Sequence, residues 1–268
     1  MIRNSIVAIA AAVASLVAET AIAPALAAET PPVAAGAGKA TPIEPGALAI
    51  LKEMSARLAG AKSLSFHVRR AFDELARDGQ PLFYMVGSDV ALVRPNRLKV
   101  ITQGDGPPAE FFYDGQEVTF FLPQKNLAAV IAAPPNIDDA LEAAYAKAGV
   151  YFPFVDFIVS DPYAAITTRL ASAFVVGQSK QVDTTTTDIV AIANPDFQAQ
   201  LWIGAEDHLP RLVWINPAPT QDKPRNMVEF TNWKVNGVSA SEPFRSAAAT
   251  KAPRMGVARP SGEGDGSP

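Results

Sequence analysis

The residues whose types could support metal or acid–base chemistry are two histidines that lie far apart in the sequence. His67 alternates with apolar residues in a segment with the period of a strand, and His208 directly precedes Leu-Pro in a turn. Neither has a second histidine or a carboxylate at the spacing of a metal ligand. We therefore interpret both as surface or turn residues, and the sequence predicts no metal site.

Carboxylate pairs and a serine close to a glycine offer equally little support for catalysis. Asp73 and Glu74 are neighbours on a predicted strand, so their side chains point to opposite faces, and residues 138–139 lie at a helix start. Residues 177–179 read Gly-Gln-Ser and lack the second glycine of a nucleophile elbow. The sequence has neither a P-loop nor a dinucleotide-binding glycine pattern. It therefore predicts a protein that is not an enzyme and that binds no cofactor.

The elements that position these residues are mostly strands, with a few helices between them. Residues 47–58 and 137–148 have apolar side chains at helical spacing, and a shorter helix is expected over 161–169. Asp114-Gly115 between two aromatic runs predicts a type I′ hairpin. Because short turns separate most strands, we expect an antiparallel meander with two or three helices. The predicted strands cover residues 64–72, 82–93, 98–102, 111–113, 117–121, 127–132, 174–182, 188–194, 198–204, 212–216 and 227–233.

Several predicted strands are apolar on both faces, as in the aromatic runs 111–113 and 120–121. An antiparallel sheet with helices on one side needs only one apolar face. Both faces of such strands must therefore meet apolar material. Two interpretations remain open: the helices fill the inner side of a curled sheet completely, or they leave a cavity that admits an apolar ligand.

The first 27 residues have the order of a secretory signal peptide. Arg3 provides a positive charge, residues 5–18 are small and apolar, and Ala25-Leu26-Ala27 fits the small-x-small pattern of a cleavage site. The apolar run is shorter than the roughly 20 residues that span a bilayer. Without cysteine, the chain has no lipid-attachment site. We expect cleavage near Ala27 and a soluble periplasmic protein with no transmembrane anchor.

Composition divides the remainder of the chain into one domain and two flanking segments. Residues 28–45 and 247–268 are rich in Pro, Ala and Gly, so we predict a flexible leader and a disordered tail. Residues 46–246 then form a single domain.

With 23 basic and 27 acidic side chains, the formal net charge is −4. This charge does not favour nucleic-acid binding, which requires clustered Lys and Arg.

Five motifs occur in an order that resembles one protein family. They are Arg94-Pro95-Asn96-Arg97-Leu98, Tyr113-Asp114-Gly115-Gln116, Gln200-Leu201-Trp202-Ile203, Leu209-Pro210-Arg211-Leu212 and Trp233. Their order makes residues 46–246 similar to predicted periplasmic proteins filed as domain of unknown function 2092. That family in turn resembles the lipoprotein carriers LolA and LolB, the envelope-stress regulator RseB and the mycobacterial lipoprotein LppX.

The resemblance implies a mainly β (α+β) domain with one strongly curved antiparallel sheet. The sheet would be a half-barrel of about ten or eleven strands, with two or three helices lidding an apolar concave face. We therefore expect a non-catalytic periplasmic carrier or sensor that binds lipid or the acyl chains of a lipoprotein, with residues 151–158 as the lid. The alternative is a module that binds an envelope protein and no lipid, with a plugged cavity. The expected ligand-binding residues are Phe66, Phe72, Tyr84, Phe112, Phe120, Phe154, Phe157, Trp202 and Trp214.

Overall fold

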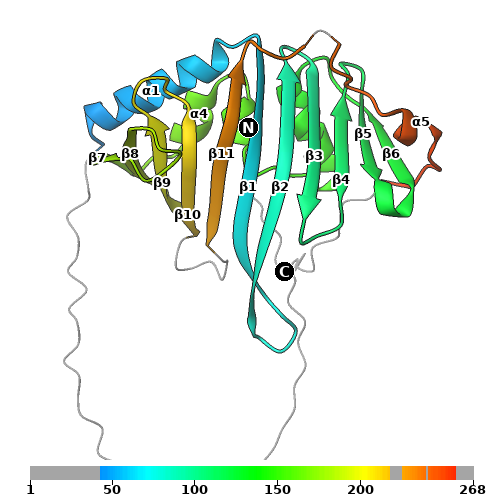
Figure 1. The fold of residues 1–268 in the computed structure, drawn as a ribbon, viewed down its shortest axis with the longest axis horizontal. Coiled ribbons are helices and arrows are strands. Elements are labelled where there is room, and N and C mark those ends of the chain that lie inside the picture. The colour runs from blue at the N-terminus through cyan, green and yellow to red at the C-terminus, as the bar shows by residue number, and fades with distance from the viewer. Residues whose placement is uncertain (1–42, 218–224, 240, 258–268) are drawn as a thin grey trace, which may run out of the picture.

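One antiparallel sheet of 11 strands forms the body of the protein, and most of the helices cover one of its faces (Figure 1). The computed structural model describes residues 43–217, 225–239 and 241–257. The predicted signal peptide, most of the predicted leader and the end of the predicted tail lie outside these residues. The sheet does not close on itself, because β6 and β7 remain as its two edges. The prediction of a mainly β fold built on a single antiparallel sheet is confirmed.

The strands lie across the sheet in the order β6-β5-β4-β3-β2-β1-β11-β10-β9-β8-β7. Their bounds are β1 Ser63–Leu75, β2 Pro81–Val93, β3 Arg97–Gly104, β4 Ala109–Tyr113, β5 Glu117–Leu122, β6 Leu127–Ala132, β7 Ser172–Ser179, β8 Thr187–Ala193, β9 Phe197–Gly204, β10 Pro210–Pro217 and β11 Asn226–Val235. The helices are α1 Pro45–Ala59, α2 Ile137–Ala148, α3 Val155–Ile158, α4 Pro162–Thr167 and α5 Ala247–Lys251, with a 3₁₀ turn at Pro123–Lys125.

The sheet consists of two meanders that meet at its centre. Strands that follow one another in the sequence pair with each other, except β6 and β7, which are the two edges. In addition β1 pairs with β11, so that Val68 lies opposite Phe230. The chain builds the half from β1 to β6, passes through α2, α3 and α4, and returns through the half from β7 to β11. Short turns account for the neighbouring pairs, whereas the central pair joins segments that are far apart in the sequence.

We call the face of the sheet that α1 to α4 cover the inner face and the opposite one the outer face. Inner-face side chains and helix side chains form one continuous apolar core. Helix α1 contributes Leu51, Met54 and Leu58, which recur at helical spacing and have no exposed surface. Aromatic rings fill the centre, where Phe66 on β1 meets Phe154 edge-on at a centroid distance of 5.8 Å. The interpretation of an inner side filled by helices therefore holds for most of the sheet.

The hairpin between β4 and β5 differs from the predicted type I′ turn. Gly115 has a φ of +97°, but neither Asp114 nor Gln116 is among the residues with positive φ. A type I′ turn requires positive φ at both central positions. The positive φ favours glycine at this position, and a Cβ on Gly115 would also lie 2.7 Å from Nδ2 of Asn96, which would then have to shift.

Asp114 stabilises this hairpin through both carboxylate oxygens. Its Oδ1 accepts hydrogen bonds from the backbone N–H groups of Gln116 (2.9 Å) and Glu117 (3.1 Å), and its Oδ2 pairs with Arg245. Burial alone would raise the pKa of the Asp114 carboxyl, but these partners together lower it. A carboxyl with a lowered pKa in the folded state stabilises the fold above its unfolded-state pKa. That stabilisation disappears as the pH falls through the folded-state value.

We expect Asp114→Asn to lower the free energy of unfolding by about 1 kcal/mol at pH 7, since it removes the ion pair and weakens the turn. The loss should shrink as the pH falls from the unfolded-state pKa of about 3.9 toward the lower folded-state pKa, where the wild-type carboxyl becomes protonated as well. Urea unfolding at pH 7 and at pH 3 measures both values. An equal loss at the two pH values would contradict the role assigned to the ionised carboxylate.

Residues 247–257 differ from the predicted disordered tail. Helix α5 packs on the outer face of β5 and β6, where Ala249 and Ala252 bury Phe121 and Ala128. The segment that leads to α5 is held against the same face, since Glu242 pairs with Lys99 of β3. Small side chains carry little apolar surface of their own, but they fit closely over the aromatic outer face of β5. This contact explains part of the apolar character on both faces of the strands.

Segments near the two ends of the described chain occupy the edges of the sheet. At β7, the N–H of Glu44 donates to the carbonyl of Ala173 at 2.7 Å. At β6, the N–H of Ala128 donates to the carbonyl of Pro253 at 3.0 Å, and its carbonyl accepts from the N–H of Met255 at 2.9 Å. Covered edges offer fewer free backbone groups to a strand from another protein.

Candidate ligand cavity

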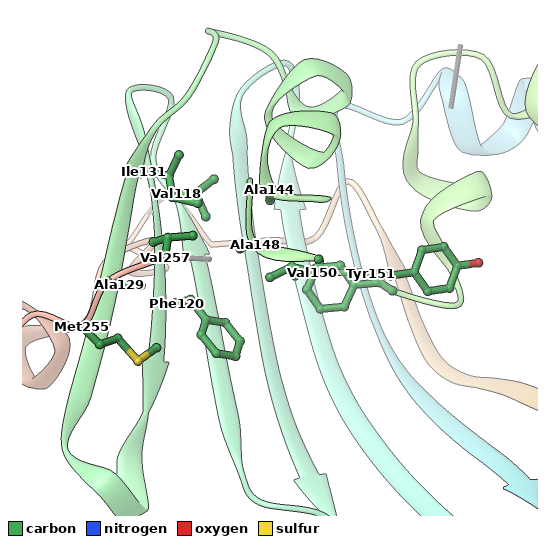
Figure 2. Close-up of a pocket in the computed structure, with 13 residues that line it drawn as sticks. Val118, Phe120, Ala129, Ile131, Ala144, Ala148, Val150, Tyr151, Met255 and Val257 are labelled. Carbon is green, nitrogen blue, oxygen red and sulfur yellow. The ribbon is translucent and has the colours of Figure 1, made fainter. Parts of the chain in front are cut away.

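A cavity of about 360 Å³ lies on the inner face, between the β6 edge of the sheet and helix α2 (Figure 2). Its volume is at the lower end of the roughly 300–1,000 Å³ that ligand pockets occupy. Its walls come from the sheet, from α2 and the loop that follows it, and from the C-terminal segment. The lining residues are Val118, Phe120, Ala129, Ile131, Ala144, Ala148, Gly149, Val150, Tyr151, Phe152, Met255, Gly256 and Val257.

The sheet wall consists of two cross-strand pairs that point inward from β5 and β6. Val118 lies opposite Ile131, and Phe120 lies opposite Ala129. Because side chains alternate between faces along a strand, residues two apart share the inner face. The pairing of β5 with β6 therefore places all four side chains in one apolar wall.

The helix wall is formed by small side chains of α2. Ala144 and Ala148 are four residues apart and thus lie on the same face of the helix. Asn136 caps the start of α2 by accepting a hydrogen bond from the N–H of Asp139 at 2.9 Å, and Gly149 ends it with a φ of +66°. The caps fix the position of the helix, and the methyl side chains leave space between it and the sheet.

The C-terminal segment closes the side of the cavity at the β6 edge. Helix α5 on the outer face and the backbone bonds to Ala128 direct residues 255–257 across this edge. Figure 2 shows Val257 beside Val118, and the side chain of Met255 extending on the same side as Phe120. We call residues 253–257 the C-terminal strap.

Tyr151 is the one polar side chain among the described residues that line the cavity. Figure 2 shows its hydroxyl pointing away from Phe120 and the rest of the lining. Although 54 % of Tyr151 is exposed, desolvation by the surrounding protein and the charge of Asp156 raise the pKa of its hydroxyl to about 12. The hydroxyl therefore stays protonated at neutral pH. The described lining can bury apolar groups, and it contains no carboxylate, imidazole or amine that would transfer a proton.

Among the nine residues predicted to bind the ligand, Phe120 is the one that lines this cavity. Phe66, Phe154 and Phe157 do lie on the inner side, but at most 5 % of each is exposed, and they belong to the filled core. Phe72 and Tyr84 stack on each other at 5.6 Å near the base of the β1–β2 hairpin. The predicted aromatic residues of the inner face therefore lie in three separate places: the cavity, the filled core and the base of the β1–β2 hairpin.

The other three predicted residues lie on the outer face, which corrects their placement in a concave cavity. Phe112 lies between Phe111 and Tyr113, whose side chains belong to the inner core. Trp202 lies between inner residues of β9 in the same way, and Trp214 of β10 is 42 % exposed. Alternation along a strand sends each of these rings to the face without helices α1 to α4.

Sequence reasoning missed the alanines of α2 and the apolar residues of the strap. Ala144 and Ala148 have helical spacing, but alanine is common on any helix and indicates no cavity. Met255 and Val257 are two residues apart in a segment otherwise rich in small residues. That spacing is typical of a strand with one buried face, and it was the sequence signal that could have indicated the strap.

His67 lies on the outer face of β1 and His208 in a turn, as predicted, and each is half-buried. Nδ1 of His67 is 2.8 Å from Oδ1 of Asp89 on the neighbouring strand, and Nδ1 of His208 is 3.6 Å from Oε2 of Glu53 in α1. Within residues 43–217, 225–239 and 241–257, no group of three or more His, Cys, Asp or Glu could hold a metal ion. The cavity is therefore the candidate site that the described geometry favours.

Solved structures with a similar arrangement share little sequence with this chain. An uncharacterized conserved protein from Thermus thermophilus is 12 % identical over 80 % of this chain and 99 % of its own, with a TM-score of 0.47. LprF from Mycobacterium bovis is 14 % identical over 76 % and 100 %, with a TM-score of 0.46. A LolA superfamily protein from Nitrosomonas europaea is 11 % identical over 72 % and 94 %, with a TM-score of 0.29.

A comparison with curated proteins gave no match. In the part of the chain that the structure describes, no helix has the length and apolar character needed to cross a membrane. The family model described as "Predicted periplasmic protein (DUF2092)" matches residues 47–257, which include the sheet, helices α2 to α5 and the C-terminal strap. The chain belongs to this family of predicted periplasmic proteins, as its motifs indicated.

Proposed function

We propose that the protein is a non-catalytic periplasmic carrier or sensor that holds an apolar ligand in the cavity between β5, β6 and α2. The ligand would be a lipid or the acyl chain of a lipoprotein. The observation that carries this proposal is the lining, in which Tyr151 is the single polar side chain among the described residues. Transfer of an apolar chain from water to such a surface is favourable.

The size of the hydrophobic effect makes partial burial of a chain sufficient for binding. Each buried methylene contributes about 0.8 kcal/mol, so a fully buried 16-carbon chain would contribute about 10 kcal/mol before the cost of association. A cavity of about 360 Å³ accepts part of such a chain as it stands. Useful affinity therefore requires no hydrogen bond within the lining.

The C-terminal strap supplies an entrance that can widen. Met255 and Val257 line the cavity. Their segment is joined to β6 by the two backbone hydrogen bonds of Ala128. Few bonds must break for the strap to leave the β6 edge, whereas α2 is tied into the main core through Ile137, Ala140 and Leu141. The ligand would enter at this edge while the sheet and α2 stay in place.

Native mass spectrometry of protein purified from the periplasm tests the proposal. We expect a mass that corresponds to cleavage near Ala27, together with an adduct of bound lipid or a new adduct after addition of palmitate. The adduct should disappear in excess apolar competitor, because binding is reversible. A ligand-free mass that does not shift with palmitate or with an acylated peptide would overturn the proposal.

A protein-interaction role is the second candidate, and apolar side chains on the β1–β2 hairpin favour it. Leu75 and Phe83 are 63 % and 64 % exposed, and the hairpin projects beyond the rest of the sheet (Figure 1). In this alternative the hairpin contacts an envelope protein and the cavity takes no ligand. A protein without a palmitate adduct whose cross-link to one envelope partner is lost in Phe83→Ser would favour the alternative.

A further inference from the structure

Arg70 provides a positive charge on the inner face, beyond the region that the core fills. It follows Phe66 and Val68 at two-residue spacing along β1, so it shares their face of the sheet. Its neighbour in register is Val86 of β2, near the base of the β1–β2 hairpin. Figure 1 shows that the helices behind the sheet lie toward the end opposite to this hairpin.

The guanidinium of Arg70 is held in place by neutral partners. Its Nε and Nη2 atoms donate to Oδ1 of Asn226, at 2.9 Å and 2.7 Å. Its Cζ lies 4.0 Å from the ring centroid of Phe72, which stacks on Tyr84. A guanidinium has five N–H donors, so three remain after the bonds to Asn226. These partners orient the planar group and do not neutralise its charge.

Acidic side chains near Arg70 act on it without forming an ion pair. Among the described residues, no carboxylate oxygen lies within 4.0 Å of its nitrogen atoms. Burial lowers the pKa of Arg70, and the charge of Glu74 raises it from a greater distance. The positive charge of Arg70 is therefore only partly balanced within the protein.

Tyr151 connects Arg70 to the cavity. It belongs to the lining, and it lies close enough to Arg70 for that positive charge to act on the pKa of its hydroxyl, in the lowering direction and against the larger effect of burial. Figure 2 shows the hydroxyl pointing away from the apolar part of the lining. An amphiphile whose chain lies in the cavity would therefore extend its polar end past Tyr151 toward the hairpin base.

We propose that Arg70 binds the anionic head group, a carboxylate or a phosphate, of the amphiphile whose chain occupies the cavity. This inference rests on the proposed function. A guanidinium can donate two parallel hydrogen bonds to either anion, and the rings of Phe72 and Tyr84 shield the contact from water on one side. The site thus selects anionic amphiphiles over neutral ones.

Isothermal titration calorimetry at pH 7 with laurate and with methyl laurate tests the selection. We expect the wild-type protein to bind laurate about tenfold more tightly than its neutral ester, as one charge-assisted contact allows. Arg70→Met should remove this ratio and leave the affinity for methyl laurate unchanged. Arg70→Lys should retain part of the ratio, because lysine keeps the charge and loses the paired donors. Arg69→Met is the matched control, since Arg69 lies on the outer face and pairs with Glu229.

Each outcome separates the head-group site from the cavity. Equal affinities for laurate and methyl laurate in the wild type would overturn the role of Arg70 and leave the proposed carrier function intact. Failure of both ligands to bind would overturn the carrier function itself. An equal loss of both ligands in Arg70→Met would show a purely structural role. Inorganic phosphate that binds as tightly as dodecyl phosphate would show a site for small anions, and would overturn the link to an amphiphile.

Discussion

Replacing Phe154 with alanine should lower the free energy of unfolding by about 3–5 kcal/mol, as is usual for a fully buried phenylalanine. The ring of Phe154 has no exposed surface. It meets Phe66 edge-on at 5.8 Å and stacks on Phe152 at 5.3 Å, so it links the β1 strand to the segment before α3. Alanine would leave a void at this junction and remove both aromatic contacts. Urea unfolding followed by circular dichroism measures the loss.

The matched control is Phe83→Ala on the β1–β2 hairpin. Phe83 is 64 % exposed, so its truncation should change the unfolding free energy by less than about 0.5 kcal/mol. The comparison also bears on the predicted lid at residues 151–158. A loss below about 1 kcal/mol in Phe154→Ala would mean that this segment detaches from the sheet easily, as a lid would. The expected larger loss means that the segment is a fixed part of the core.

The local elements of the fold were predictable because each has its own signal in the sequence. Period-two alternation predicts β1, and the helix caps Asn136 and Gly149 predict both ends of α2. The pairing of β1 with β11 had no such signal, since its partners Val68 and Phe230 are separated by most of the domain. Turn length indicates sequential neighbours only. The strand pair that joins the two meanders could therefore be identified only from the structure.

The candidate site was less predictable, because composition does not reveal which face of an apolar strand is concave. Phe111 and Phe112 are identical side chains on adjacent positions, yet one belongs to the inner core and the other to the outer face. The outer face of β5 is also buried, since Phe121 lies under α5. Helix α5 consists of three alanines, a threonine and a lysine, a composition that resembles a disordered tail. The helix that covers the outer face of β5 was therefore not recognised from the sequence, and the concave face of these strands could not be assigned.

Replacing Ala148 with tryptophan should reduce the affinity for a dansyl-labelled undecanoic acid by at least about tenfold. Ala148 is on the last turn of α2 and lines the cavity, so an indole at this position would occupy space that the ligand needs. Because the ring fills a void and displaces no packed side chain, the unfolding free energy should change by less than about 1 kcal/mol. Fluorescence titration of the probe and urea unfolding measure the two quantities.

Ala146→Trp is the control that separates occupation of the cavity from a general effect of tryptophan on the helix. Ala146 belongs to the same helix, but it is exposed and does not line the cavity. Its replacement introduces the same indole and the same change in helix propensity, so it should leave probe affinity unchanged. Loss of binding in Ala148→Trp alone, with stability retained, would place the acyl chain between α2 and β5–β6. Unchanged binding in both variants would mean that the chain binds elsewhere, and the exposed apolar side chains of the β1–β2 hairpin would become the surface to test.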